Sequence, residues 1–192
     1  MIQPTPENIK IIFDIFFEAD LKLWNEFSQK LTVKKYDKNQ TIKEYNTTEK
    51  FMNILVKGSV GLFVWNGQDD ICINLYYENN FFCDYLSLLK QKQTLIKSEA
   101  LEDCVVWSIH HKDLQELYSK SLIGVNIGKV ISEELFIKKQ TEQVNLLTLK
   151  PQDRYLKLLE ERPEIIRRTP LKIIASYLGL TAESLSRIRK RI

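Results

Sequence analysis

The C-terminal stretch of the chain reads Leu171-Lys-Ile-Ile-Ala-Ser-Tyr-Leu-Gly-Leu-Thr-Ala-Glu-Ser-Leu-Ser-Arg-Ile-Arg-Lys-Arg-Ile192. Thr169 is placed to cap a helix that begins here, because a threonine side chain can accept from the free N–H groups of a first turn. Gly179 can take the left-handed backbone conformation that turns a chain sharply. Thr181 is placed to cap a second helix, with Leu185 on its inward face. The stretch therefore predicts a helix-turn-helix.

The second of these helices has the side chains of a DNA reader. Glu183 and Ser184 lie in its exposed first turn, and Arg187 follows Glu183 by four residues on the same face. Arginine can bind guanine O6 and N7 together, and glutamate can accept from cytosine N4. A plain basic surface helix is the alternative. Phosphate contacts are expected from residues around this face, namely Ser186, Arg189, Lys190 and Arg191, and from Thr169.

The charge of the chain is distributed unevenly. Residues 150–192 hold eleven Lys and Arg against five Asp and Glu, whereas the rest of the chain holds 17 against 20. A basic C-terminal segment on a mildly acidic body is typical of a nucleic-acid-binding module carried by another domain.

Residues 31 to 110 alternate between short β-prone runs and turn signals. Asn66-Gly67 separates two of the runs and predicts a hairpin. Asp84–Lys90 is a helical insert. This spacing predicts a jelly roll, so the fold class is α+β with an N-terminal double-stranded β-helix. The expected strands are Leu31–Tyr36, Thr41–Tyr45, Met52–Val56, Ser59–Trp65, Ile71–Tyr77, Leu95–Leu101 and Val105–Ile109.

A long proline-free helix is expected over Ser121–Leu149, about 43 Å in length. Apolar residues recur along it at seven-residue spacing, which favours lengthwise packing against a partner helix, and Ile127, Ile131 and Leu135 widen this stripe. Packing on the chain's own β-domain is the alternative. We expect a β-roll at 1–120, a dimer helix at 121–149 and a helix-turn-helix domain at 150–192. The expected dimer contacts are Ile123, Ile127, Val130, Ile137 and Val144.

The segment Tyr177-Leu-Gly-Leu-Thr-Ala-Glu-Ser-Leu-Ser-Arg-Ile188 resembles the helix-turn-helix of the Crp–Fnr transcription regulators. The order of β-roll, long helix and DNA domain is similar too, and Gly58 matches the family's strand–turn glycine. The resemblance implies a homodimer with two recognition helices in successive major grooves, about 34 Å apart. It places Glu183, Ser184 and Arg187 on base-reading positions and Thr181 on a phosphate-contacting position. It implies double-stranded DNA, a second copy of the chain and RNA polymerase as partners.

The sequence departs from this family where a cyclic nucleotide would bind. Cys83-Asp84 stands in place of a Gly-Glu pair, and Thr94-Leu95, or Lys97-Ser98 in a shifted register, stands in place of Arg-Ser. Lysine does not replace the two-pronged grip of arginine on a phosphate. We therefore expect no cyclic AMP and no cofactor; another small ligand, or none, stays open. The candidate pocket residues are Cys83, Asp84, Tyr85, Thr94 and Lys97.

Composition favours a binding protein over an enzyme. The three cysteines form no C-x-x-C motif, and no cysteine precedes Cys72. His110 and His111 are the only histidines. A disulfide scaffold, a metal site or a metal-dependent enzyme of β-roll type is not expected. We expect a cytoplasmic protein with no membrane partner, and no β-wing beyond Ile192. The alternative function is a ligand-binding or protein-interaction module of the same fold that binds DNA weakly and without sequence preference.

Overall fold

The computed structural model describes residues 3–15, 18–120 and 122–192, and the side chains of residues 122, 123 and 127 lie outside the description. Two helices precede the β-roll and begin at side-chain caps. Thr5 accepts from the Asn8 N–H at 3.3 Å, and Asp20 accepts from the Leu23 N–H at 2.9 Å. These caps satisfy N–H groups that a first turn leaves free. The helices are α1 (Pro6–Phe13) and α2 (Leu21–Ser28).

The β-roll consists of two four-stranded antiparallel sheets. Their strand orders are β1-β8-β3-β6 and β2-β7-β4-β5. The predicted jelly roll is confirmed, and the short strand β6 is an addition to the prediction. The strands are β1 (Leu31–Tyr36), β2 (Thr41–Lys43), β3 (Phe51–Lys57), β4 (Val60–Trp65), β5 (Asp70–Tyr76), β6 (Phe81–Phe82), β7 (Ile96–Ala100) and β8 (Cys104–His110).

Gly58 joins β3 to β4 where no other residue fits. Its φ is +98°, and a Cβ atom there would lie 2.7 Å from the Asp103 carbonyl oxygen. The hairpin at Asn66-Gly67 is also present. Gly67 takes a φ of +102°, and the Asn66 side chain accepts from the N–H groups of Gln68 and Asp69. The turn signals read from the sequence are therefore the turns of the fold.

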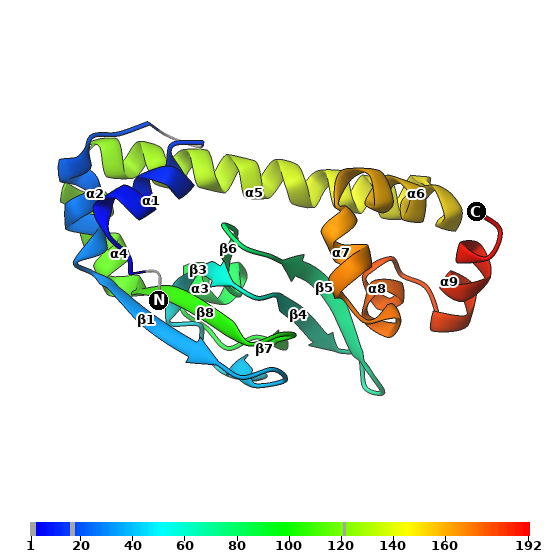
Figure 1. Ribbon diagram of the computed structural model, residues 1–192. Coiled ribbons are helices and arrows are strands. Elements are labelled where there is room, and N and C mark those ends of the chain that lie inside the picture. Colours follow the sequence, from blue (N-terminus) through cyan, green and yellow to red (C-terminus); the bar gives the residue numbers. More distant parts are fainter. Residues whose placement is uncertain (1–2, 16–17, 121) are drawn as a thin grey trace.

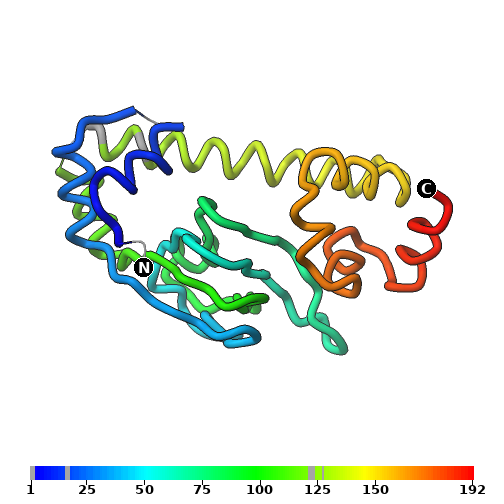
Figure 2. Tube along the Cα trace, in the orientation of Figure 1, coloured from blue at the N-terminus to red at the C-terminus, as the bar shows by residue number. Residues whose placement is uncertain are grey.

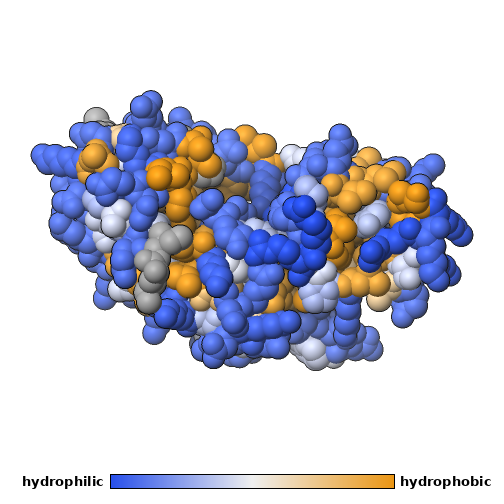
Figure 3. Space-filling model, in the orientation of Figure 1, coloured by the Kyte–Doolittle hydropathy of each residue, from blue (hydrophilic) through white to orange (hydrophobic). Residues whose placement is uncertain are grey.

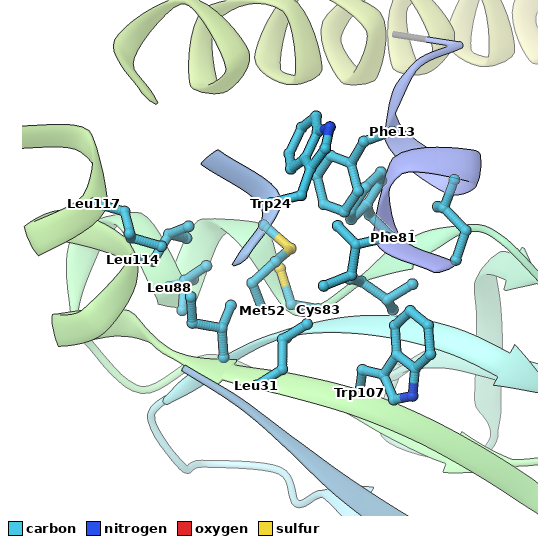
Figure 4. Packing of buried hydrophobic residues seen from close by; sticks show 14 residues of the cluster. Phe13, Trp24, Leu31, Met52, Phe81, Cys83, Leu88, Trp107, Leu114 and Leu117 are labelled. Atoms are coloured by element: carbon cyan, nitrogen blue, oxygen red, sulfur yellow. The ribbon is translucent and has the colours of Figure 1, made fainter. Parts of the chain in front are cut away.

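The first sheet packs against the N-terminal helices. Figure 4 shows Phe13 and Trp24 against Phe81, with ring centroids 4.9 Å apart for Phe13–Trp24 and 4.8 Å for Phe13–Phe81. Met52 and Trp107 of the same sheet belong to this cluster. A small apolar cavity of about 50 Å³ remains among these side chains. The N-terminal helices thus anchor the end of the roll from which the later helices leave.

The remaining helices extend along the roll and past it. α5 has 27 residues and spans about 40 Å. Figure 1 shows it running over the roll, with α1 and α2 at one end and α6 to α9 at the other. The tube in Figure 2 shows that α8 folds back beside β5, with α9 beyond it. The helices that follow α2 in the described chain are α3 (Tyr85–Lys90), α4 (His111–Lys120), α5 (Leu122–Thr148), α6 (Pro151–Glu161), α7 (Pro163–Arg168), α8 (Leu171–Tyr177) and α9 (Ala182–Arg189).

Candidate nucleic-acid interface and ligand pocket

Helices α8 and α9 form the predicted helix-turn-helix. Gly179 has the left-handed φ of +68° that the turn requires. The Leu180 N–H donates to the Ala175 carbonyl at 2.8 Å and closes the end of α8. A Cβ atom at position 179 would lie 3.1 Å from a methyl of Leu146 on α5. The turn therefore depends on a glycine for its backbone conformation and for its close approach to the long helix.

Helix α9 turns its polar side outward. The Thr181 side chain accepts from the Ser184 N–H at 3.2 Å, so the predicted cap is confirmed. Leu185 is fully buried, whereas Glu183 and Arg187 are exposed. Because the buried and exposed positions follow the helical period, the apolar side fixes the helix to its domain and leaves the polar side free to face a groove.

Of the side chains expected to read bases, Glu183 and Arg187 are exposed and Ser184 is half-buried. Arg187 reaches the Ser184 hydroxyl at 3.4 Å, a long contact that leaves the other guanidinium donors open. Hydrogen bonds from its own backbone N–H and from Thr181 lower the pKa of Glu183, so its carboxylate is ionised at neutral pH. Among the described ion pairs, none joins Glu183 to Arg187. Both charges can therefore turn toward a ligand.

The residues expected to meet phosphates fall into two groups. Arg189, Lys190 and Arg191 are exposed at the end of α9, Thr181 is exposed at its start, and Ser186 is half-buried. Thr169 differs from the expectation. It is 7% exposed, and its hydroxyl is hydrogen-bonded to that of Tyr77 in the β-roll. It does not cap α8 either, because Pro170 holds the cap position without a side-chain bond. In this arrangement Thr169 cannot reach a phosphate.

The C-terminal helices are attached to the roll by an ion cluster that the sequence did not reveal. The Arg168 guanidinium donates to both carboxylate oxygens of Glu78, at 2.7 and 2.8 Å. It also donates to both oxygens of Glu102, at 3.1 and 2.5 Å. The hydrogen bonds with Arg168 lower the pKa of Glu78 to about 2. We call Arg168, Glu78 and Glu102 the interdomain cluster.

An apolar core continues across the same boundary. Phe63, Leu75 and Tyr77 of the roll belong to one buried cluster with Ile165 and Leu185 of the C-terminal helices. Backbone groups add to it, because the Cys72 N–H donates to the Ser176 hydroxyl at 2.8 Å. The C-terminal helices therefore share a core with the outer face of the β4–β5 sheet.

The candidate ligand pocket at the start of α3 is filled by the chain's own charges. The Lys43 ammonium donates to the Asp84 carboxylate at 2.8 Å, to the Thr94 hydroxyl at 3.1 Å and to the Ile96 carbonyl at 2.7 Å. Thr94 is also hydrogen-bonded to Asp84. The Lys43 and Asp84 side chains are 5% and 0% exposed. An internal ion pair thus occupies this end of α3.

A second carboxylate, that of Glu49, accepts hydrogen bonds from backbone N–H groups near the start of α3. Glu49 is buried and accepts from the N–H groups of Asp84, Lys50 and Phe51. Asp84 itself accepts from the Ser87 N–H at 3.1 Å and caps α3. The N–H groups of Asp84 and Ser87 are therefore already paired with protein carboxylates.

The other predicted pocket residues lie apart from this ion pair. Cys83 is buried, and desolvation raises the pKa of its thiol well above the usual value. The Tyr85 hydroxyl is 2.8 Å from that of Ser132 on α5. Lys97 is paired with Asp70 at 2.7 Å and with Glu99 at 3.0 Å. The structure therefore brings together Asp84 and Thr94, while Lys43 and Glu49 are additions that no local sequence signal revealed.

Helix α5 has two different sides. Its inner side, where Gly124, Ile131, Leu135 and Lys138 recur at three- and four-residue spacing, is buried or half-buried. Of the predicted dimer contacts, Ile137 and Val144 are exposed and Val130 is half-buried; the side chains of Ile123 and Ile127 lie outside the described residues. Among the side chains of α5 that the structure describes, the exposed large apolar ones are Val125, Phe136, Ile137, Val144, Leu146 and Leu147.

Apolar side chains also gather where α5 meets α6. The space-filling view in Figure 3 shows hydrophobic atoms at this end of the face and a second group of them in the other half of the view. The side chains where α5 meets α6 include Leu146, Leu147, Leu156 and Leu159, which are all exposed. Across the described parts of the chain, no helix combines the length and apolar character that crossing a membrane requires. The described residues also hold no group of three or more His, Cys, Asp or Glu placed to bind a metal.

Comparison with known proteins agrees with this architecture. Residues 33–121 match the family of the cyclic nucleotide-binding domain. FixK2 from Bradyrhizobium japonicum has a similar structure, with a TM-score of 0.70, 18% identity, and coverage of 84% of this chain and 83% of that one. The c-di-GMP responsive global regulator CLP from Xanthomonas campestris gives a TM-score of 0.68 and 18% identity, with coverage of 90% and 91%.

A third similar structure is the catabolite activator protein of Thermus thermophilus. Its TM-score is 0.59 at 14% identity, and the match covers 92% of this chain and 85% of that one. A search of curated proteins with the sequence gave no match. Residues 33–121 are therefore similar to a cyclic nucleotide-binding domain, and the chain has the fold of these three solved structures.

Proposed function

We propose that the protein is a homodimeric transcription regulator that binds double-stranded DNA through α9. The observation that carries this proposal is the polar side of α9, where Glu183 and Arg187 are exposed on a helix held by the buried Leu185. Arg189, Lys190 and Arg191 supply positive charge at its end. A short capped helix with this arrangement fits a major groove and can contact both base edges and phosphates.

The dimer is supported by the outer side of α5. Phe136 and Leu147 are 69% and 76% exposed, and Ile137 and Val144 are also exposed. Residues 137, 140, 144 and 147 follow the three- and four-residue spacing of a helix–helix seam, with Gln140 as its polar member. This side faces away from the roll. A second copy of α5 would remove these side chains from water and set two α9 helices at a fixed separation.

Cyclic nucleotides are not the proposed effectors. Lys43 and Asp84 neutralise each other at the start of α3, and Glu49 takes the Asp84 N–H. A cyclic phosphate placed there would meet two buried carboxylates, and like charges in a desolvated site repel strongly. Binding would require breaking an ion pair whose members have no access to water.

The test is selection of the full-length protein on a random duplex-DNA pool at near-physiological salt, without added ligand. We expect a two-fold-symmetric motif whose half-sites lie about one helical turn apart. Arg187→Ala should cost about 1–3 kcal/mol at one base pair per half-site and relax the preference there. Arg167→Ala is the matched control, because Arg167 is exposed on α7 and distant in sequence from α9.

Two results would count against the proposal. An unstructured or absent motif, with binding that depends only on salt, favours the alternative of a module that binds DNA without sequence preference. If Arg187→Ala selects the same motif as the unmodified protein, Arg187 does not contact a base.

A further inference from the structure

A second cavity lies between α5 and the turn that joins β5 to β6. It has a volume of about 170 Å³. Phe81, Ile131 and Leu135 supply apolar walls. The polar groups come from the remaining lining residues, which are Tyr76, Asn79, Asn80, Glu134 and Lys138. The cavity is separate from the ion pair of Lys43 and Asp84, because none of the residues at the start of α3 lines it.

Lys138 is the unusual group in this cavity. It takes part in none of the ion pairs found among the described residues, and its ammonium lies 5.4 Å from the ring centroid of Tyr76. Desolvation, aided by the charge of Arg162, lowers the pKa of Lys138 to about 8. The next residue, Lys139, does have a counter-charge, because its ammonium lies 2.8 Å from the Glu142 carboxylate. The charge of Glu142 offsets part of the desolvation of Lys138, and an anion bound beside the Lys138 ammonium would offset more of it.

The cavity is not part of the proposed dimer seam. Successive residues of an α-helix are about 100° apart around its axis, so Lys138 and Ile131 lie on the side of α5 that faces the roll. Phe136 and Leu147, which are exposed, lie on the other side. A partner helix on that outer side would leave the cavity to a small molecule.

The dimensions and the charges limit what fits. An apolar cavity of about 150 Å³ is known to hold benzene, so 170 Å³ suits a body of about one ring. Asn79 and Asn80 can add amide hydrogen bonds at the turn. Glu134 stands at the same cavity and disfavours a second negative charge on the occupant. Nucleotides and polyphosphates are therefore too large and too negative.

We propose that this cavity binds a small monocarboxylate with a planar apolar body, of about the size of benzoate. Its carboxylate accepts from the Lys138 ammonium, and its ring packs against Phe81, Ile131 and Leu135. Charge-assisted hydrogen bonds of this kind are stronger than neutral ones, and partial exclusion of water strengthens them further. The inference does not rest on DNA binding.

The test uses the full-length protein and sodium benzoate as the probe, with binding followed by calorimetry and by NMR shifts of methyl groups. Benzamide, which has the same ring and no charge, and acetate, which has the charge and no ring, are the ligand controls. Lys138→Gln is the test variant. Lys129→Gln is the protein control, because Lys129 is an exposed lysine of the same helix.

We expect benzoate to bind at least ten-fold more tightly than benzamide or acetate, and to shift the methyl signals of Ile131 and Leu135. Lys138→Gln should lose at least ten-fold in benzoate affinity, and Lys129→Gln should keep it. Thermal unfolding of the free variants verifies that both are folded. Equal affinity for benzoate and benzamide, equal affinity in Lys138→Gln, or no benzoate binding to the folded protein would each overturn the proposal.

Discussion

The interdomain cluster is open to a direct energetic test. Arg168 makes four contacts of 2.5–3.1 Å with Glu78 and Glu102, and each of the three side chains is about one-third exposed, at 31–33%. Buried hydrogen bonds to charged groups contribute about 1.5–3 kcal/mol each, and exposed ion pairs about 0–1. At this intermediate exposure, Arg168→Met should lower the free energy of unfolding by about 2–3 kcal/mol near pH 7.

The loss should also depend on pH. The pKa of Glu78 is lowered to about 2 in the folded protein, against roughly 4.3 in an unfolded chain. Its contribution to stability is therefore present above about pH 4.3 and disappears as the pH falls through about 2. The difference in unfolding free energy between the unmodified protein and Arg168→Met should shrink over this same range.

Urea unfolding at pH 7 and at several values down to the acid limit of the folded state measures both quantities. Lys157→Met is the control. It removes an exposed pair with Glu161 inside α6, at 2.9 Å, and should cost no more than about 0.5 kcal/mol. A cost for Arg168→Met as small as that of the control, or one that does not change between pH 5 and pH 2.5, refutes the assignment of Arg168 as an interdomain anchor.

Three further predictions concern the seam, the α3 site and the cavity. The double variant Phe136→Glu with Leu147→Glu should be monomeric in sedimentation at micromolar concentration, because it places charges in the proposed seam. The control Ile11→Glu, which changes an equally exposed apolar residue of α1, should leave the dimer intact. A dimer that persists in the double variant would place the interface elsewhere. Asp84→Ala should destabilise the fold by about 3–5 kcal/mol in urea unfolding, because it leaves a buried ammonium without its carboxylate; a loss below 1 kcal/mol would contradict the buried pair. Lys138→Met should have a higher free energy of unfolding than the unmodified protein below pH 8, because folding disfavours the Lys138 ammonium. This difference should vanish towards pH 10.5, where the lysine is neutral in both states. A difference that does not change with pH would point to packing instead.

Local signals in the sequence predicted local structure well. The cap of Thr181, the positive φ of Gly67 and Gly179, and most strand boundaries follow from the chemistry of residues within a short segment. The strand β6 was not predicted, because two residues are too few to show an alternating pattern.

The contacts that define the sites are separated along the chain. Lys43 meets Asp84 across 41 residues, and Arg168 meets Glu102 and Glu78 across 66 and 90 residues. No periodicity within one segment encodes such a pairing. For the same reason Thr169 was predicted as a cap and a phosphate contact, although its hydroxyl is used by Tyr77 of the roll.

The long helix shows how one pattern can combine two signals. The sequence stripe included Ile131 and Leu135 together with Ile137 and Val144. In the structure the first two line the side that faces the roll, and the last two are exposed on the other side. The interpretation of packing on the β-domain thus describes the inner side of this helix, and the exposed outer side is the one that we propose packs against a second copy.

The shared core of the C-terminal helices limits how this protein can diversify. Ile165 and Leu185 are buried against Phe63, Leu75 and Tyr77 of the roll. A recombination event that replaced the C-terminal helices with those of another protein would therefore expose apolar surface on both parts. The exposed side of α9 touches none of this core. Under the proposed role in DNA binding, point substitutions there would change the recognised sequence without disturbing the fold, whereas exchange of the whole C-terminal segment would disrupt the core.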